Sequence, residues 1–372
     1  FQWSREIGST FHIMVTAREG HTLEEIETVL DLELEKIIRM GINTVELELS
    51  KTEWEARFIR GLEQIGGFGG KADALNGYNT FLGDPGMFNW DLNRYKSVTT
   101  KDMKTAIQKY LNMDKRSILK IVQSADMSAS DDLVDRNIMP GASGDLSFIP
   151  PEIQRAELKN GLKLLVIEDH KLPLVEVTII LNIGWAADPV DKPGAGALTA
   201  DLLDEGTRRR NAMEIATEAK RLGTDIGTSS YFDGTYVSFN SLKKNLDQSL
   251  DLMADMILNP TFPQEELDRK KQEYLGRIQQ ENKQPVTAAV KHYFRLLFGS
   301  DHPYGQPYTG SGTEESISAI TRDDLVDYYN SNYFSSNASV IVAGDITVVE
   351  AVAKLEKYLG KWKRGKAALS EV

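Results

Sequence analysis

The chain has 372 residues, a length that suits two domains better than one, each large enough to bury its own core. Hydrophobic residues make up 41% of it and charged residues 26%, as in ordinary soluble globular proteins. A formal net charge of −12 argues against nucleic acid and anionic membranes as partners, and the absence of cysteine excludes disulfides, thiolate metal sites and cysteine nucleophiles.

The first residues, Phe1-Gln2-Trp3-Ser4-Arg5, contain neither an initiator methionine nor the basic and apolar regions of a signal peptide. No apolar run approaches the length of a membrane span. We therefore expect a piece of a longer parent protein, without a membrane span of its own, whose targeting signal would lie upstream.

The first third of the chain predicts a mixed α and β unit. The expected elements are a strand at 10–17, helices at 22–40, 45–65, 71–82 and 100–111, and a strand at 116–123. A glycine-rich stretch, 66–71, separates two of these helices. Ile65 and Ala72 stand where a phosphate-binding loop needs its first glycine and its Mg²⁺-binding Ser or Thr, so we expect a flexible turn there.

A polar stretch rich in Ser, Asp and Gly, 126–150, predicts a linker. Beyond it, apolar periodicity predicts a second α and β unit. Its expected elements are strands at 161–168, 173–183, 224–230 and 234–240, helices at 194–204 and 211–221, further helices between 243 and 298, and a capped helix followed by a strand. The run Arg208-Arg209-Arg210 is expected to face solvent, with a basic patch for an acidic neighbour as the alternative.

Two parts of the chain resemble each other at an offset of about 220 residues. The aligned stretches are 44–51 with 264–271, 98–103 with 320–325, and 117–122 with 339–343. In the second pair, Thr99 and Thr321 are each placed to cap a helix. Because the first unit has no counterpart of residues 151–230, we interpret it as the back half of a truncated copy.

Residues 194–207 read Gly-Ala-Gly-Ala-Leu-Thr-Ala-Asp-Leu-Leu-Asp-Glu-Gly-Thr. This stretch resembles the metal-binding helix of the pitrilysin or insulinase family of zinc metallopeptidases, the inverzincins, in which His-x-x-Glu-His stands between a glycine and a Gly-Thr pair. In that frame Ala197 and Asp201 occupy the two histidine positions, and Ala200 occupies the position of the general-base Glu. The third ligand, a Glu about 75 residues further on, aligns with Arg277.

A catalytic zinc ion needs three protein ligands and one open position. One carboxylate beside a guanidinium supplies at most one ligand, so we expect no metal and no other cofactor in this chain. Asp201 and Arg277 are expected to form a salt bridge in the space that zinc occupies in active relatives, with two unrelated solvated charges as the alternative. The histidines, at positions 12, 21, 170, 292 and 302, are not spaced to share a metal from one helix.

The resemblance extends from Ala156 to Trp362. It is also carried by Asn259-Pro260-Thr261-Phe262, His302-Pro303-Tyr304-Gly305, Gly312-Thr313-Glu314-Glu315 and Gly344-Asp345. It implies an α+β fold of repeated half-domains, each a mostly antiparallel sheet backed by helices, of the insulinase or LuxS-metalloenzyme-like type. The implied organisation is a truncated C-terminal-type half-domain at 1–125, the linker at 126–150, and a degenerate N-terminal-type half-domain at 151–372.

Half-domains of this family are paired around a large chamber. The resemblance therefore implies another insulinase-like half-domain as partner, in the same parent chain or as a paired subunit. It also implies that this chain is inactive by itself and that the parent is a zinc metalloendopeptidase, whose zinc lies in an upstream or partner catalytic half-domain. Exported relatives favour the bacterial periplasm or cell envelope over the cytoplasm, although the sequence does not fix the compartment.

In relatives, an extended substrate peptide pairs with the edge strand that follows the motif helices. The corresponding residues here are Thr224, Asp225, Ile226, Gly227, Thr228, Ser229 and Ser230. An exposed edge offers main-chain hydrogen bonds to any extended segment. We therefore expect peptide binding at these residues, with an edge covered by a neighbouring half-domain as the alternative.

The expected function is that of a non-catalytic portion of an insulinase-like zinc metallopeptidase, which contributes chamber wall and peptide binding. The alternative is a purely structural or assembly module with no role in proteolysis. An enzyme with a different, metal-free site would need a cluster of acid, base or nucleophile, and the sequence shows none at recognisable spacing.

Overall fold

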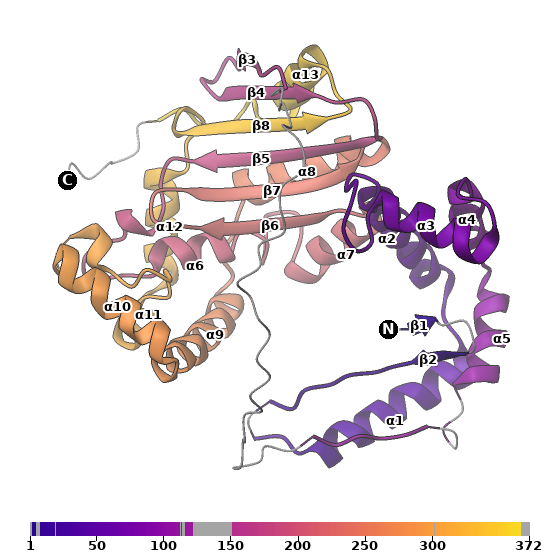
Figure 1. Ribbon diagram of the computed structural model, residues 1–372. Coiled ribbons are helices and arrows are strands. Elements are labelled where there is room, and N and C mark those ends of the chain that lie inside the picture. The colour runs from indigo at the N-terminus through magenta and orange to yellow at the C-terminus, as the bar shows by residue number, and fades with distance from the viewer. Residues whose placement is uncertain are drawn as a thin grey trace, which may run out of the picture. The chain divides into compact units, whose positions relative to one another are not determined.

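The structure is a computed structural model that describes residues 2–4, 8–18, 20–111, 113, 116–121, 151–300 and 302–365 (Figure 1). The chain divides into two compact units. The first comprises residues 1–47 and 93–149, and the second comprises residues 48–92 and 150–372. The predicted linker, 126–150, lies outside the described residues.

The second unit is built on a six-stranded sheet (Figure 1). Its strands are β3 (Gln154–Glu157), β4 (Lys163–Glu168), β5 (Leu174–Leu181), β6 (Asp225–Ser230), β7 (Thr235–Leu242) and β8 (Ala338–Gly344). They lie in the order β3-β4-β8-β5-β7-β6, and each neighbouring pair is antiparallel except β4 with β8. This mostly antiparallel sheet, backed by helices, confirms the predicted α+β class.

Strand β5 shows why these residues form the centre of the sheet. It reads Leu-Val-Glu-Val-Thr-Ile-Ile-Leu, and β-branched residues suit a pleated surface. Val175, Val177 and Ile179 point to one face, since alternate residues of a strand share a face, and each is at most 1% exposed. Their burial fixes the register of β5 against β7 and β8.

Eight helices of the second unit follow or interrupt the strands within residues 151–300 and 302–365. They are α6 (Ala195–Asp201), α7 (Ala212–Leu222), α8 (Leu246–Leu258), α9 (Gln264–Lys283), α10 (Pro285–Phe298), α11 (Glu314–Ala319), α12 (Arg322–Asn332) and α13 (Val348–Leu359). Helix α8 contacts β7 and α13, and α13 contacts β3 and β4, so these two helices back the sheet together. Helix α6 contacts β6 and α12.

The predicted helical stretch between 243 and 298 is three helices because proline residues interrupt it. Helix α8 ends before Pro260, and the chain turns through Phe262, whose φ of 47° is positive although it is not a glycine. Phe262 is buried, which holds this turn in place. Pro285 then stands in the first turn of α10, where its missing N–H costs no hydrogen bond.

The first unit contains β1 (Gln2–Ser4), β2 (Ser9–Phe11), α1 (Leu23–Met40) and α5 (Thr100–Tyr110), whereas α2 (Thr44–Gly61) and α4 (Phe88–Lys96) each begin in one unit and end in the other. Helix α3 (Lys71–Leu82) belongs to the second unit. Both predicted threonine caps are present: Thr99 and Thr321 form capping boxes with Asp102 and Asp324.

Two predicted strands of the first unit were wrong, and two elements, α4 and β3, were not predicted. The strand expected at 10–17 pairs only as far as Phe11, and residues 116–121 of the strand expected at 116–123 have no sheet partner among the described residues. The sequence also gave no sign of α4 or β3. A strand is stabilised by hydrogen bonds to the backbone of a neighbouring strand, and a local pattern of side chains does not reveal where that neighbour lies.

In the parts of the chain that the structure describes, no helix has the length and apolar character needed to span a membrane.

Candidate functional site

Helix α6, which carries the degenerate motif, begins at a glycine and is capped by a buried carboxylate. Gly194 adopts a φ of 101°, a conformation that side chains other than glycine rarely adopt. The Asp188 carboxylate accepts the N–H of Gly194 at 2.6 Å and that of Gly196 at 2.7 Å. Burial raises the pKa of Asp188 to about 7, against the lowering effect of these hydrogen bonds. The carboxylate therefore satisfies helix N–H groups that have no partner within the helix.

Small residues make α6 a packing surface. Ala200 is fully buried and Ala197 nearly so, and a Cβ atom on Gly196 would lie 2.7 Å from the Tyr328 hydroxyl oxygen of α12. That hydroxyl donates to the carbonyl oxygen of Gly184 at 2.8 Å. Two of the three motif positions, Ala197 and Ala200, thus place methyl groups in the core and offer no atom that could bind a metal ion.

Asp201, at the last motif position, accepts a hydrogen bond from a tyrosine that the sequence did not predict as its partner. The Tyr274 hydroxyl, on α9, donates to Asp201 Oδ2 at 2.7 Å. Arg277 approaches the same oxygen at 3.9 Å, and its guanidinium carbon lies 4.1 Å from the centre of the Tyr274 ring. The expected salt bridge is therefore present only at the outer limit of ion-pair distance, and with side chains 27% and 44% exposed it contributes little stability.

Tyr274 is 1% exposed, and burial, followed by the Asp201 charge, raises its pKa well above the ordinary value. The phenol therefore stays protonated and remains a donor to Asp201. Its position one helical turn before Arg277 places both side chains beside the carboxylate. The only sequence signal was that Tyr274 lies three positions before Arg277, which aligns with the third ligand.

These residues do not fit a zinc ion. Two alanines offer no donor atom, Asp201 is engaged by Tyr274, and a guanidinium stands where a third ligand would be. Within residues 2–121 and 151–365, as far as they are described, no group of three or more His, Cys, Asp and Glu side chains could hold a metal ion. The arrangement joins α6 to α9 and offers no set of ligands that could hold a zinc ion and its water.

A second acidic group follows α6. Glu205 Oε1 contacts Arg269 at 2.6 Å and Lys270 at 3.0 Å, and although burial opposes ionisation, these cations lower the pKa of Glu205. The neighbouring Asp204 has a buried Oδ1 without a hydrogen-bond partner among the described residues. Burial, and then the Glu205 charge, raise the pKa of Asp204 to about 6. This group ties the end of α6 to the start of α9.

The prediction that the arginine run faces solvent was wrong for its last residue. Arg210 is only 14% exposed and contacts Glu218 at 2.6 Å, Asp255 at 2.8 Å and Asp251 at 2.9 Å. Arg209 reaches the same two aspartates at 3.0 and 3.1 Å. The carboxylates come from α7 and α8, so the arginines join these helices to the loop after α6, a role that only the tertiary structure reveals.

Six of the seven predicted peptide-binding residues, Asp225 to Ser230, form β6 at the edge of the sheet. Strand β6 pairs with β7 on one side, and no other described strand pairs with its second side (Figure 1). Gly227 is exposed, and a Cβ atom there would meet nothing within 4 Å. Ile226 points into the core, whereas Thr224 lies before the strand and donates its hydroxyl to the Asn240 carbonyl at 2.9 Å. The backbone N–H and C=O groups without a described strand beside them therefore belong to β6, on the side opposite β7.

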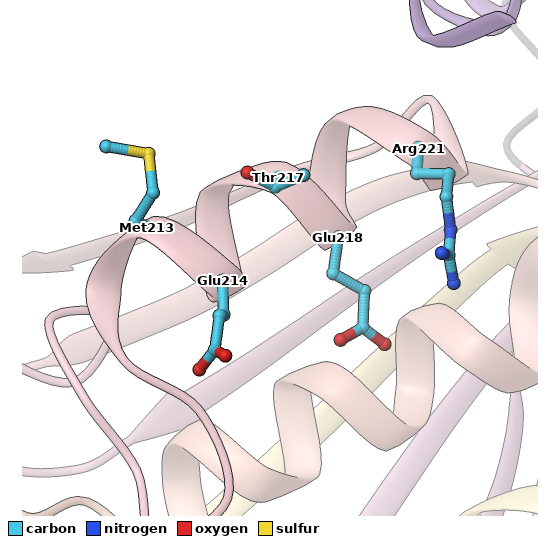
Figure 2. Close-up of a pocket in the computed structure, with 5 residues that line it drawn as sticks. All are labelled: Met213, Glu214, Thr217, Glu218 and Arg221. Carbon is cyan, nitrogen blue, oxygen red and sulfur yellow. The ribbon is translucent and has the colours of Figure 1, made fainter. Parts of the chain in front are cut away.

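A shallow depression lies on α7, away from the degenerate motif. It is lined by Met213, Glu214, Thr217, Glu218 and Arg221, all from this one helix (Figure 2). Glu218 is already engaged by Arg210. The depression therefore offers no convergent polar groups beyond those that hold α7 in place.

The mostly antiparallel sheet backed by helices, with helix α6 in the place of the motif, is the fold of an insulinase-like metallopeptidase domain. Comparison with known families agrees. The family model described as Insulinase (Peptidase family M16) matches residues 163–305, and the one described as Peptidase M16 inactive domain matches residues 319–371. This chain belongs to the insulinase family.

Relatives and solved structures give the same result. The chain is 29% identical over 209 residues to an uncharacterized zinc protease of Mycobacterium leprae, covering 55% of this chain and 46% of that protein. It is 24% identical over 215 residues to human mitochondrial cytochrome b-c1 complex subunit 1, covering 58% and 44%. The crystal structure of a peptidase M16 inactive domain from Pseudomonas fluorescens matches with a TM-score of 0.56 and 27% identity, covering 59% and 53%. The chain thus spans about half the length of the relatives it matches.

Proposed function

We propose that this chain is a non-catalytic portion of an insulinase-like zinc metallopeptidase, in which residues 151–372 form a degenerate half-domain that contributes chamber wall and binds extended peptide along β6. Hydrolysis would take place at zinc held by another half-domain, in the same parent chain or in a paired subunit. The proposed division is a truncated half-domain at 1–125, a linker at 126–150 and the degenerate half-domain at 151–372.

This proposal rests on two neighbouring features. One is the edge strand β6, whose second side has no described strand beside it, and the other is helix α6, which lacks a set of side chains that could bind zinc. Helix α6 contacts β6, so an extended segment paired with β6 would run beside the degenerate motif. Main-chain pairing accepts any sequence, which suits a peptide-binding surface that performs no chemistry of its own. Family membership supports the same role.

Proline substitution in β6 tests peptide binding. In an antiparallel pair, the N–H groups of successive residues point alternately toward the neighbouring strand and away from it. Of Gly227→Pro and Thr228→Pro, one therefore removes a bond to β7 and lowers the melting temperature, whereas the other removes only an outward donor. Binding is measured by fluorescence anisotropy with labelled, carboxymethylated α-lactalbumin, a permanently unfolded polypeptide.

The variant with an unchanged melting temperature should bind this probe several-fold more weakly than the unsubstituted chain. The matched controls are Arg155→Pro and Ala156→Pro in β3, the strand at the opposite edge of the sheet, and the better folded of the two should bind normally. Equal binding by all stable variants would refute peptide binding at β6.

Zinc analysis tests the non-catalytic part of the proposal. We expect substoichiometric zinc by elemental analysis after the purified chain is dialysed against zinc and then against buffer. Tight, stoichiometric zinc together with chelator-sensitive peptide cleavage would overturn it.

One observation favours the alternative of a structural or assembly module. Human cytochrome b-c1 complex subunit 1, by its name a component of a larger complex, resembles this chain as closely as several proteases do. Under this alternative β6 would be covered by a neighbouring half-domain, and the β6 proline variant would weaken binding of that half-domain while no unfolded probe binds.

For the compartment we propose the bacterial periplasm or cell envelope. The support is a fold shared with the periplasmic protease PqqL from Escherichia coli, at a TM-score of 0.54 and 18% identity. Fractionation of cells that produce the full parent protein would test it, and recovery in the cytoplasmic fraction would contradict it.

A further inference from the structure

Arg277, which aligns with the third zinc ligand of active relatives, contacts fewer carboxylates than comparable arginines of the second unit. Its one carboxylate partner among the described residues is Asp201, at 3.9 Å, and its side chain is 44% exposed. Arg210 and Arg269 each contact three carboxylates, all at 2.9 Å or less. Because a guanidinium carries five N–H donors, a single distant contact leaves most donors of Arg277 available to a ligand.

The carboxylates nearest to Arg277 along α9 do not neutralise it. Glu273 and Glu281 lie one helical turn before and one helical turn after it. Glu273 contacts Arg269 at 2.6 Å, and Glu281 contacts Lys291 at 2.5 Å. Both carboxylates are therefore engaged by other cations.

The guanidinium is held in place by a residue of its own helix. Its carbon atom lies 4.1 Å from the centre of the Tyr274 ring, within the range of a cation–π interaction. Tyr274 is buried and donates its hydroxyl to Asp201 Oδ2 at 2.7 Å, so the oxygen nearest to Arg277 already has a partner. A stacked arginine loses less side-chain freedom when it binds a ligand.

An extended peptide paired with the outer side of β6 would point alternate side chains toward the face on which α6 lies. Ile226 and every second residue after it share one face of β6, and Ile226 belongs to the same apolar core as Leu198 of α6. Peptide residues opposite these positions would share that face. Helix α6 contacts β6 (Figure 1) and ends at Asp201, beside Arg277.

We propose that Arg277 binds the carboxylate of an Asp or Glu side chain in an extended peptide that pairs with β6. This inference rests on the proposed peptide binding at β6 and adds to it a preference for acidic side chains on the face toward α6. The planar guanidinium suits a carboxylate, which it can bind through two parallel hydrogen bonds. A carboxylate at the end of the peptide has the same chemistry, but it would end the main-chain pairing at that residue. A side chain within the segment therefore fits a continuous edge strand better.

A preference for acidic peptides would oppose the charge of the whole chain, which is −12. At a salt concentration of about 0.15 M, charges more than about 8 Å from the peptide are largely screened. Tighter binding of an acidic peptide therefore requires a cation in contact with it, because general electrostatic attraction would act in the opposite direction.

Fluorescence anisotropy with the full chain, at about 0.15 M salt, tests this preference. The fluorescein-labelled probes are four Thr-Glu repeats with an amidated end, four Thr-Gln repeats with an amidated end, and four Thr-Gln repeats with a free carboxylate end. The alternating pattern allows an acidic side chain to face α6 after a shift of at most one residue. We expect the acidic peptide to bind about two- to fivefold more tightly than the amidated Gln peptide, as for one half-exposed ion pair.

Variants at Arg277 assign the preference to this side chain. Arg277→Gln should abolish the difference between the acidic and the amidated Gln peptide. Arg277→Lys, which keeps the charge but loses the planar fork, should reduce the difference, and it carries the test if Arg277→Gln has a lowered melting temperature. The matched control is Lys283→Gln, which removes the same charge from an exposed side chain of α9 and should leave the preference intact.

The outcomes separate this inference from peptide binding at β6. If the stable β6 proline variant weakens binding of both amidated peptides, but the acidic peptide has no advantage or keeps it in Arg277→Gln, the role of Arg277 is refuted and binding at β6 stands. If neither peptide binds, or if proline in β6 has no effect on binding, both proposals fail. Tighter binding of the free-ended peptide than of the acidic one, abolished by Arg277→Gln, would assign Arg277 to a chain end and overturn the side-chain source.

Discussion

Replacing Arg210 with leucine tests the ion-pair network that joins the loop after α6 to α7 and α8. Arg210 is 14% exposed and contacts three carboxylates, of which Asp255 has a fully buried side chain. Leucine keeps part of the apolar stem but removes every one of these contacts, so the carboxylates remain with too few partners.

The expected loss of stability in Arg210→Leu follows from the burial of Arg210 and Asp255. Removing one partner of a buried ion pair costs about 3–5 kcal/mol. Because Arg209 still reaches Asp251 and Asp255, we expect the lower end of this range, about 3 kcal/mol. For a unit of this size that corresponds to a fall in melting temperature of about 6–12 °C. Arg221→Leu is the matched control: Arg221 is exposed on α7, and its replacement should cost less than about 0.5 kcal/mol.

The assay is urea denaturation at neutral and at acidic pH. Burial opposes ionisation of Asp255, but the hydrogen bonds from Thr207 and Arg210 lower its pKa below the ordinary value. A depressed folded-state pKa contributes stability above the unfolded value, near about 3.9, and that stability is lost as the pH falls through the folded value. The difference between the unsubstituted chain and Arg210→Leu should therefore shrink in acid. A loss below about 1 kcal/mol, or one independent of pH, would refute the network's role.

Two further predictions concern α6 and the turn after β4. Gly196→Val places side-chain atoms against the Tyr328 hydroxyl and the Asp188 carboxylate, 2.7 and 2.8 Å from the Cβ position, and should lower stability by about 1–3 kcal/mol; an unchanged melting temperature would contradict this packing. The hydrogen bond from His170 to Asp345 raises the pKa of His170. This pair therefore stabilises the fold fully below the pKa of an unfolded histidine, about 6.5, and the stabilisation is lost as the pH rises through the folded-state pKa. Asp345→Asn should lower the pKa of His170 measured by NMR titration, and an unchanged titration would contradict the pairing.

Elements with strong local signals were predictable from the sequence. Thr99 and Thr321 each precede an acidic residue by three positions, and both form the expected capping boxes because these bonds lie within one turn of the chain. Strand β5 was predictable from its run of β-branched residues. Strand β3, Gln-Arg-Ala-Glu, has no such pattern and exists through its pairing with β4.

The candidate site likewise has features that the sequence predicted and features that it did not. The absence of ligand side chains at positions 197, 200 and 277 is a property of residue identity, so the sequence alone was enough to argue against zinc chemistry there. The partner of Asp201 was not predictable, because Tyr274 comes from a helix 73 positions away. The arginine run also looked like a solvated charge cluster until the fold placed α7 and α8 around it.

The sequence by itself determined which helix once had the frame of a metal site, the class of the fold and the position of the strand at its edge. Only the tertiary structure decided which groups occupy that space and which side of β6 has no described strand beside it. The physical reason is the range of the interactions: caps, turns and propensities act within a few residues, whereas burial, ion pairing and strand pairing join residues that are distant along the chain.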